Sequence, residues 1–107
     1  MPAGDFQIEA IHEPELVRLV LTGELDIAGA QRLEAAIQDA CASGSHVELD
    51  LEGLKFIDSS GLRAFLALHN SAASGDFTYS LIAGPPAVHR TFVLTGLDRV
   101  LGFSARR

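Results

Sequence analysis

Hydrophobic and polar residues alternate near the start of the chain, which is the pattern of a strand with one buried face. Phe6, Ile8 and Ala10 are apolar, and the residues between them are polar. A second apolar run covers residues 16–22, and the short segment before it, residues 12–15, has the composition of a turn. The spacing therefore predicts two antiparallel strands joined as a hairpin.

The period of the apolar positions then changes to that of a helix. Apolar residues recur every three or four positions, at Ile27, Ala30, Leu33, Ile37 and Cys41. Asp26 stands where an N-cap belongs and Gly44 where a C-cap glycine belongs, so we expect a helix between them. Cys41 falls on the apolar stripe, which favours buried packing over a reactive thiol.

Two later segments, residues 46–51 and 77–81, alternate strictly between apolar and polar positions. Strands of a parallel sheet that is covered on both faces read as continuous apolar runs, and these two segments do not. The sequence therefore predicts an α/β fold with a mixed, mostly parallel sheet that begins with the N-terminal hairpin. Helices should pack on one face of this sheet, and its other face should be largely exposed to water.

A second helix is predicted from the Ser-Ser-Gly stretch to about Gly75. Its buried side should comprise Leu62, Phe65, Leu66, His69 and Ala73. Its opposite side is small, weakly polar and nearly uncharged, and comprises Arg63, Ala67, Asn70 and Ser74. Such a face is typical either of a protein contact or of a plain small-residue surface, and the sequence leaves both interpretations open.

A third helix is expected to open with Pro85 and Pro86, since proline is tolerated in the first turn of a helix. Val88 and Phe92 form its apolar pair, and Gly96 should end it. A last apolar patch that should pack back on the core comprises Leu97, Val100, Leu101 and Phe103.

Composition and charge narrow the class of protein. The chain has 107 residues, 48% of them apolar and 21% charged, which fits one globular domain spanning residues 1–107. Eight basic and fourteen acidic residues give a net charge of −6, which makes nucleic acid a poor partner. A single cysteine leaves no internal disulfide or zinc-thiolate cluster. Without a visible signal peptide or bilayer-spanning run, we expect a cytoplasmic protein with no membrane insertion.

The apolar pattern breaks between Ile57 and Leu62, where the chain reads Asp-Ser-Ser-Gly. One interpretation is that Ser59 or Ser60 caps the second helix. Another is a nucleophilic serine, but a hydrolase elbow needs Gly-x-Ser-x-Gly with a histidine and an acid placed to serve it. The histidines at positions 12, 46, 69 and 89 lack that placement and the spacing of metal ligands, and no glycine-rich phosphate loop occurs. We therefore expect no enzyme, metal or cofactor.

The third interpretation is a hydroxyl that another protein modifies. A phosphoryl group on Ser59 would add about −1.5 to −2 charges. The free N–H groups and the dipole of a helix N-terminus should tolerate this anion within the fold. Beside Asp58, on a domain of net charge −6, the same anion would be costly inside a protein interface. The domain would stay folded while its complex dissociated, which is the behaviour of a switch.

The chain resembles the STAS domain family, and within it the free-standing bacterial anti-anti-sigma factors, or anti-sigma factor antagonists. Three stretches carry the resemblance: residues 21–26 (LTGELD), residues 47–62 with the Asp-Ser-Ser-Gly loop, and residues 84–97 with Gly-Pro-Pro and Thr-Gly-Leu. The resemblance implies a mixed sheet with helices on one side. It also implies that the unphosphorylated protein binds an anti-sigma factor, itself an ATP-dependent serine kinase, and thereby frees a sigma factor. Phosphorylation would end binding, and a PP2C-type phosphatase would restore it.

The resemblance also assigns roles to residues. Ser59 is implied as the phosphate acceptor. The residues implied to shape its loop at the partner-binding site are Asp58, Ser60, Gly61 and Leu62. Asp26 is implied as an acid that contacts the partner or assists phosphotransfer, alongside its role as an N-cap. The small-residue face with Ala67 is the expected extension of this partner-binding surface.

Arg63 departs from the best-known members of the family, which have glycine at this position. It could pair with a phosphate on Ser59 from within the domain, or it could contact the kinase. The rival function within the family is a STAS scaffold subunit of a transporter, lipid-transport or stress-signalling complex, in which Ser59 need not be phosphorylated.

Overall fold

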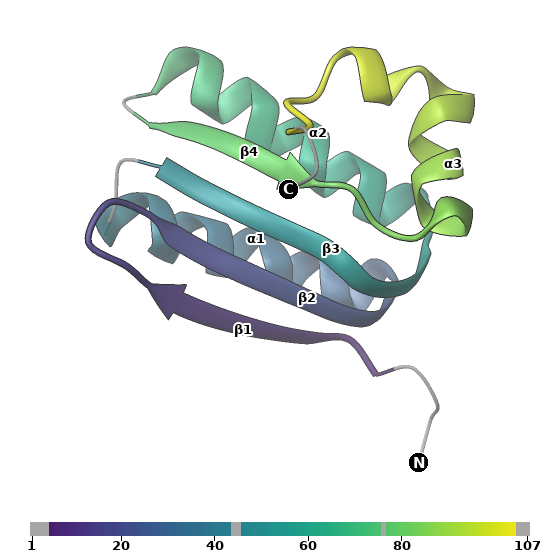
Figure 1. Ribbon diagram of the computed structural model, residues 1–107, viewed down its shortest axis with the longest axis horizontal. Helices are drawn as coiled ribbons and strands as arrows, with labels where there is room; N and C mark the ends of the chain where they lie inside the picture. The colour runs from purple at the N-terminus through teal and green to yellow at the C-terminus, as the bar shows by residue number, and fades with distance from the viewer. Residues whose placement is uncertain (1–4, 44–45, 76, 105–107) are drawn as a thin grey trace.

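A computed structural model describes residues 5–43, 46–75 and 77–104 of the chain. In chain order its elements are β1 (Gln7–His12), β2 (Val17–Leu25), α1 (Ile27–Ser43), β3 (His46–Ile57), α2 (Ser59–Ser74), β4 (Thr78–Ile82), α3 (Pro86–Thr95) and the short 3₁₀ turn η1 (Leu97–Arg99) (Figure 1). This is the order that the changes of hydrophobic period predict.

The four strands form one sheet in the order β1-β2-β3-β4. β1 and β2 pair antiparallel, and the turn between them is closed by a 2.9 Å hydrogen bond from the Glu13 N–H to the Leu16 carbonyl. β2 pairs parallel with β3, and β3 parallel with β4. The predicted mixed, mostly parallel sheet with an N-terminal hairpin is therefore confirmed.

The helices cover one face of this sheet, as predicted. Figure 1 shows α1 and α2 behind the sheet, and α3 follows the carboxyl end of β4. Leu19, Leu49 and Leu81 are neighbours across three strands, and all are buried on the helix side. Phe65 of α2 meets Phe92 of α3 edge to face, with ring centroids 5.6 Å apart. Burial of this apolar face is the main force that joins the two layers.

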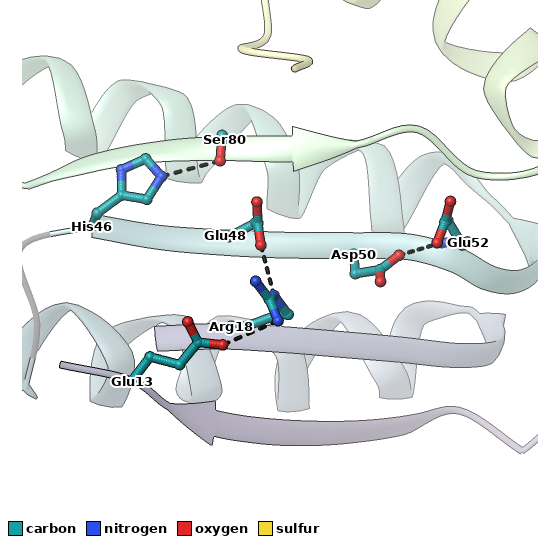
Figure 2. Close-up of polar contacts among 7 residues, drawn as sticks. All are labelled: Glu13, Arg18, His46, Glu48, Asp50, Glu52 and Ser80. Carbon is teal, nitrogen blue, oxygen red and sulfur yellow. Dashed lines mark hydrogen bonds and ion pairs between the residues drawn. The ribbon is translucent and has the colours of Figure 1, made fainter. Parts of the chain in front are cut away.

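The opposite face of the sheet carries polar side chains in an ordered network (Figure 2). Arg18 of β2 lies between two carboxylates, donating to Glu48 at 2.6 Å and pairing with Glu13 at 3.0 Å. The hydrogen bond to Glu48 raises the pKa of the Arg18 guanidinium. His46 bridges to β4 through Ser80, at 3.0 Å from its Nε2. This alternation of polar positions is what lets one face of β3 remain outside the core.

β3 is longer than the strictly alternating stretch of residues 46–51 that predicted it. The alternation fails because the pairing with β2 shifts register at two places, between Val20 and Thr22 and between Gly23 and Glu24. Gly53 lies at this irregularity, and a Cβ on it would stand 2.6 Å from Thr22 Cγ2. The bulge changes which residues face the core, so the strand continues to Ile57 without a simple period of two.

The buried stripe of α2 is rotated from the predicted one. Its buried residues are Gly61, Leu62, Ala64, Phe65 and Leu68. Leu66 and His69 are only half-buried and Ala73 is exposed, so that part of the prediction is wrong. The small side chains at positions 61 and 64 let α2 approach its neighbours closely, and they therefore define the inward face.

The chain after α3 returns to the sheet, as the last apolar patch predicts. The Leu81 N–H donates to the Gly102 carbonyl at 2.8 Å, and the Ser104 N–H donates to the Leu81 carbonyl at 2.8 Å. Phe103 packs against Phe92 with ring centroids 5.1 Å apart. Val100 is the exception and is 48% exposed, because the η1 turn directs its neighbour Leu101 inward.

Three further predictions concern the last turn of α1 and the ends of α1 and α3. Cys41 is half-buried against the core, and burial raises the pKa of its thiol, in agreement with a packing role. Gly44, the predicted C-cap, lies outside the described residues. Gly96 ends α3 as predicted, with a left-handed φ of 78°.

Candidate functional site

The Asp-Ser-Ser-Gly break is the junction between β3 and α2. Asp58 is extended, with φ −109° and ψ −173°, and α2 begins at Ser59. The Asp58 carboxylate accepts hydrogen bonds from the backbone N–H groups of Ser60 at 2.9 Å and Gly61 at 3.2 Å. The N-cap is therefore Asp58, and the prediction that Ser59 or Ser60 caps this helix is wrong.

The physical reason is that the helix begins one residue earlier than a serine cap requires. A carboxylate at the N-cap satisfies two free N–H groups and also places a negative charge at the positive end of the helix dipole. One expectation changes with this finding. Free N–H groups at the helix start were expected to help tolerate a phosphate, but those of Ser60 and Gly61 already bind Asp58.

Because Asp58 caps the helix, neither serine hydroxyl is needed as a cap. Within the described residues, neither hydroxyl makes a hydrogen bond to the protein. Ser59 is exposed and Ser60 is half-buried. An exposed hydroxyl without a partner in the fold is accessible to an enzyme that modifies it.

The residues that follow the serines support the loop from beneath. Gly61 is buried, and a Cβ on it would lie 2.8 Å from Ile57 Cγ1 and 2.8 Å from Leu25 Cγ. Leu62 is 8% exposed and belongs to the core. These two residues pack beneath the loop and offer no accessible side chain to a partner.

Asp26 holds the equivalent position on the neighbouring junction, between β2 and α1. Its carboxylate accepts a 3.0 Å hydrogen bond from the Gly29 N–H, so the predicted N-cap is confirmed. Leu25 and Ile57 are paired across the two strands, and the Asp58 N–H donates to the Leu25 carbonyl at 3.2 Å. Two helix N-termini, each capped by an aspartate, therefore meet at the same edge of the sheet.

Arg63 and Ala67 are exposed and follow Ser59 at intervals of four residues along α2. Because a helix turns once in about 3.6 residues, these three side chains share one stripe of the helix surface. A shallow groove runs between α1 and α2, lined by Glu34, Ile37, Gln38, Ala64, Ala67, Leu68 and Ser71. Ala67 thus belongs both to the predicted small-residue face of α2 and to the wall of this groove.

Two exposed apolar side chains at this edge were missed by the sequence interpretation. Ile27, directly after Asp26, is 66% exposed although it was assigned to the buried stripe. Phe56, two residues before Asp58, is 48% exposed. Alternation with the buried Ile57 explains the outward direction of Phe56, but no signal in the sequence indicated it, because the period of two fails beyond residue 51. We call Ile27 and Phe56 the apolar rim of the site.

The histidines do not complete a catalytic arrangement with Ser59. His69 Nδ1 lies 2.7 Å from the Tyr79 hydroxyl on β4, so this half-buried histidine has a partner, as expected. Among the described residues, no group of three or more His, Cys, Asp or Glu side chains is arranged to hold a metal ion. In the same part of the chain, no helix has the length and apolar character needed to cross a membrane.

Comparison with known proteins gives two kinds of similarity. In sequence, the chain is 27% identical over 99 residues to the anti-sigma F factor antagonist of Paenibacillus polymyxa, covering 91% of this chain and 85% of the relative. It is 26% identical over 98 residues to the anti-sigma-B factor antagonist of Staphylococcus epidermidis, covering 91% of each.

In structure, the fold matches an anti-sigma factor antagonist from Mycobacterium paratuberculosis with a TM-score of 0.83, 24% identity, and coverage of 95% of this chain and 87% of that one. It also matches the anti-sigma factor antagonist SpoIIAA in its unphosphorylated form, with a TM-score of 0.74, 26% identity, and coverage of 95% and 90%. The family described as "Mlab, STAS domain" matches residues 9–102. Since this match spans nearly the whole chain and the sheet order and helix placement agree with it, the protein belongs to the STAS domain family.

Proposed function

We propose that this protein is a cytoplasmic anti-sigma factor antagonist whose binding to an anti-sigma factor is ended by phosphorylation of Ser59. The relatives named above are anti-sigma factor antagonists, and the fold of SpoIIAA has also been solved in a phosphorylated form that this chain matches with a TM-score of 0.68. The observation that carries the proposal is the exposed Ser59 hydroxyl, which no described residue engages.

In this proposal the anti-sigma factor is an ATP-dependent serine kinase. The bond between the γ-phosphorus of ATP and the bridging oxygen of ADP breaks, and a bond from that phosphorus to Ser59 Oγ forms. The hydroxyl proton passes to a base of the kinase, and ADP leaves. A PP2C-type phosphatase would hydrolyse the ester and restore the hydroxyl.

The effect of the phosphate follows from the charges at the junction. Asp26 and Asp58 already place two carboxylates at this edge of the sheet, beside the apolar rim. Docking would have to desolvate a dianion at Ser59 next to these two carboxylates, which costs several kcal/mol if no positive group of the partner compensates it. Helix α2 begins with a capped turn that needs no serine hydroxyl, so the fold itself should tolerate the ester.

The test is a binding measurement with the candidate anti-sigma kinase, before and after incubation with ATP, with the phosphate mapped by mass spectrometry. We expect phosphate on Ser59 and a rise in Kd of about 100-fold or more. Ser59→Ala should stay bound in the presence of ATP. Ser43→Ala, an exposed serine in the last turn of α1, is the matched control and should release as the parent does.

The second candidate is a scaffold subunit that binds a constant partner without phosphorylation. The matching family is described as "Mlab, STAS domain", and this description names no sigma-factor role. In the same experiment, binding that persists whatever the state of Ser59 would support this candidate and contradict the switch.

A further inference from the structure

We propose that Arg63 is the internal counter-ion of a phosphate on Ser59, a positioning residue that holds the ester against the stripe of α2. This inference rests on the proposed function, because it concerns the modified form of the same serine.

The first observation is that three backbone donors of the first turn, those of Ser60, Gly61 and Leu62, are already in use. A phosphate on the first residue of a helix would ordinarily bind the free N–H groups of the first turn. Here the N–H groups of Ser60 and Gly61 bind the Asp58 carboxylate. The Leu62 N–H donates to the Asp58 carbonyl at 3.1 Å. Few backbone donors of this turn are thus left for a phosphate, and a nearby cationic side chain would be its strongest partner.

The second observation is that Arg63 is uncommitted, unlike Arg18 and Arg32. Arg18 is held by Glu13 and Glu48, and Arg32 donates to the Phe6 carbonyl at 2.7 Å. Arg63 is exposed and makes no hydrogen bond or ion pair with the residues that the structure describes. A guanidinium that is free of other contacts can turn toward a new anion without breaking any interaction.

The third observation is the spacing. Arg63 follows Ser59 by four residues in an uninterrupted helix. Residues at this spacing have Cβ atoms about 5–6 Å apart, and an acid that precedes a base by four is the favourable orientation. Helical side chains also lean toward the N-terminus, so the Arg63 side chain covers the turn that contains Ser59. Arginine is suited to the role because its planar fork can donate two parallel hydrogen bonds to a phosphate.

The consequence is that phosphorylation should weaken partner binding less than it would without Arg63. Pairing with Arg63 would offset part of the negative charge that repels the partner, and it would fix the ester in one orientation. The phosphorylated protein should then retain more affinity for its partner than the same protein without Arg63. Asp58 and Asp26 face the ester from the two helix starts and act in the opposite sense, by repelling it.

The test uses the full chain with phosphoserine incorporated at position 59 during synthesis, so that no kinase is needed. The second pKa of the phosphate is followed by ³¹P NMR, since a neighbouring cation favours the dianion and lowers this pKa. We expect Arg63→Ala to raise it by about 0.5 unit, and Arg63→Lys to restore most of the difference. The difference should shrink in high salt.

The matched control is the double variant Arg63→Ala with Ala67→Arg, which keeps the net charge and the helix face. It moves the cation to eight residues from Ser59, about 12 Å along the helix axis. This control should titrate as Arg63→Ala does. Equal pKa values in the parent and Arg63→Ala proteins would overturn the inference.

A separate binding measurement keeps this inference distinct from the proposed function. The ratio of the phosphorylated to the unphosphorylated Kd should be larger for Arg63→Ala than for the parent. If phosphoserine at position 59 leaves the Kd unchanged in both, the proposed function fails while the ³¹P titration still decides the role of Arg63. If Arg63→Ala weakens the unphosphorylated complex and leaves the phosphate pKa unchanged, Arg63 is a partner contact and the inference is wrong.

Discussion

At the scale of single residues, the identity of the capping side chain decides what the serines are free to do. Asp58 accepts from two N–H groups of the first turn of α2, so the hydroxyl of Ser59 is not needed by the fold. A serine cap in its place would have tied a hydroxyl to the backbone. Asp58 caps the helix and Ser59 faces solvent, so Ser59 can be modified without breaking a hydrogen bond that the fold needs.

This division predicts the effect of removing the cap. Asp58→Ala should lower the free energy of unfolding by about 1 kcal/mol, because two N–H groups lose their acceptor and the helix dipole loses its anion. For a domain of this size, that corresponds to a fall in Tm of roughly 4–8 °C. Asp58→Asn should lose much less, since the amide oxygen still accepts a hydrogen bond.

Thermal or urea unfolding followed by circular dichroism measures both variants. Asp39→Ala, an exposed position within α1, provides the control and should change stability by about 0.5 kcal/mol at most. Equal free energies of unfolding for Asp58→Ala and the parent would mean that capping by Asp58 does not stabilise the fold.

At the scale of elements, the start of α2 is held against the ends of two strands. Gly61 faces Ile57 at the end of β3 and Leu25 at the end of β2, and both of these side chains are buried. A side chain at position 61 would push the helix start away from the sheet. The position of Ser59 relative to Asp26 therefore depends on this close contact.

Gly61→Ala should destabilise the protein, although alanine favours a helix by about 1 kcal/mol over glycine. The new methyl group would stand 2.8 Å from Ile57 Cγ1 and 2.8 Å from Leu25 Cγ. These atoms lie near the backbone within buried, packed side chains, so relief of the overlap requires a shift that costs roughly 1–3 kcal/mol. We expect a net loss of about 1 kcal/mol in chemical denaturation.

Gly102→Ala is the matched control for this substitution, because its nearest neighbours would lie 3.5 Å away in ordinary contact. It should change the unfolding free energy by about 0.5 kcal/mol at most. A stabilised Gly61→Ala protein would show that the helix start can move and that the contact does not fix it.

At the scale of the whole molecule, Tyr79 joins three parts of the chain. It lies on β4, its hydroxyl is 2.7 Å from His69 Nδ1 of α2, and it accepts a 2.9 Å hydrogen bond from the Gly102 N–H of the C-terminal segment. Burial raises the pKa of the Tyr79 phenol, while the hydrogen bond from Gly102 acts in the opposite direction. Ionisation of this group is therefore linked to the stability of the fold.

The sign of the pH dependence follows from the raised pKa. In the unfolded chain the phenol loses its proton near its ordinary pKa of about 10, whereas the folded chain keeps it to higher pH. The unfolded state then binds fewer protons, so stability that is present below about pH 10 should decline as the pH rises further. The sequence contains one tyrosine, so ultraviolet absorbance of the phenolate reports on Tyr79 alone.

Tyr79→Phe should weaken the alkaline decline in stability measured by urea unfolding at several pH values. It should also cost about 1–2 kcal/mol at neutral pH, because the Gly102 N–H and His69 each lose a hydrogen-bond partner. An unchanged alkaline slope in Tyr79→Phe would mean that other groups, such as lysine, cause the decline.

The sequence by itself determined the elements and their order. Alternation predicted the hairpin, the period of three or four predicted α1, and proline followed by a later glycine predicted the bounds of α3. These signals are local, because each depends on the backbone preference or burial of residues within a few positions of one another. The Asp26 cap belongs to the same class, since the acid and the N–H that it binds are three residues apart.

The tertiary structure decided the length of β3, the inward face of α2 and the exposure of the site. The bulge that extends β3 depends on its pairing with β2, and the exposure of Ile27 and Phe56 depends on where the helix layer stops relative to the sheet. Asp58 rather than a serine became the cap because the strand pairing through Ile57 and Leu25 fixes where α2 begins. These features depend on contacts between residues far apart in sequence, whose geometry no local pattern encodes.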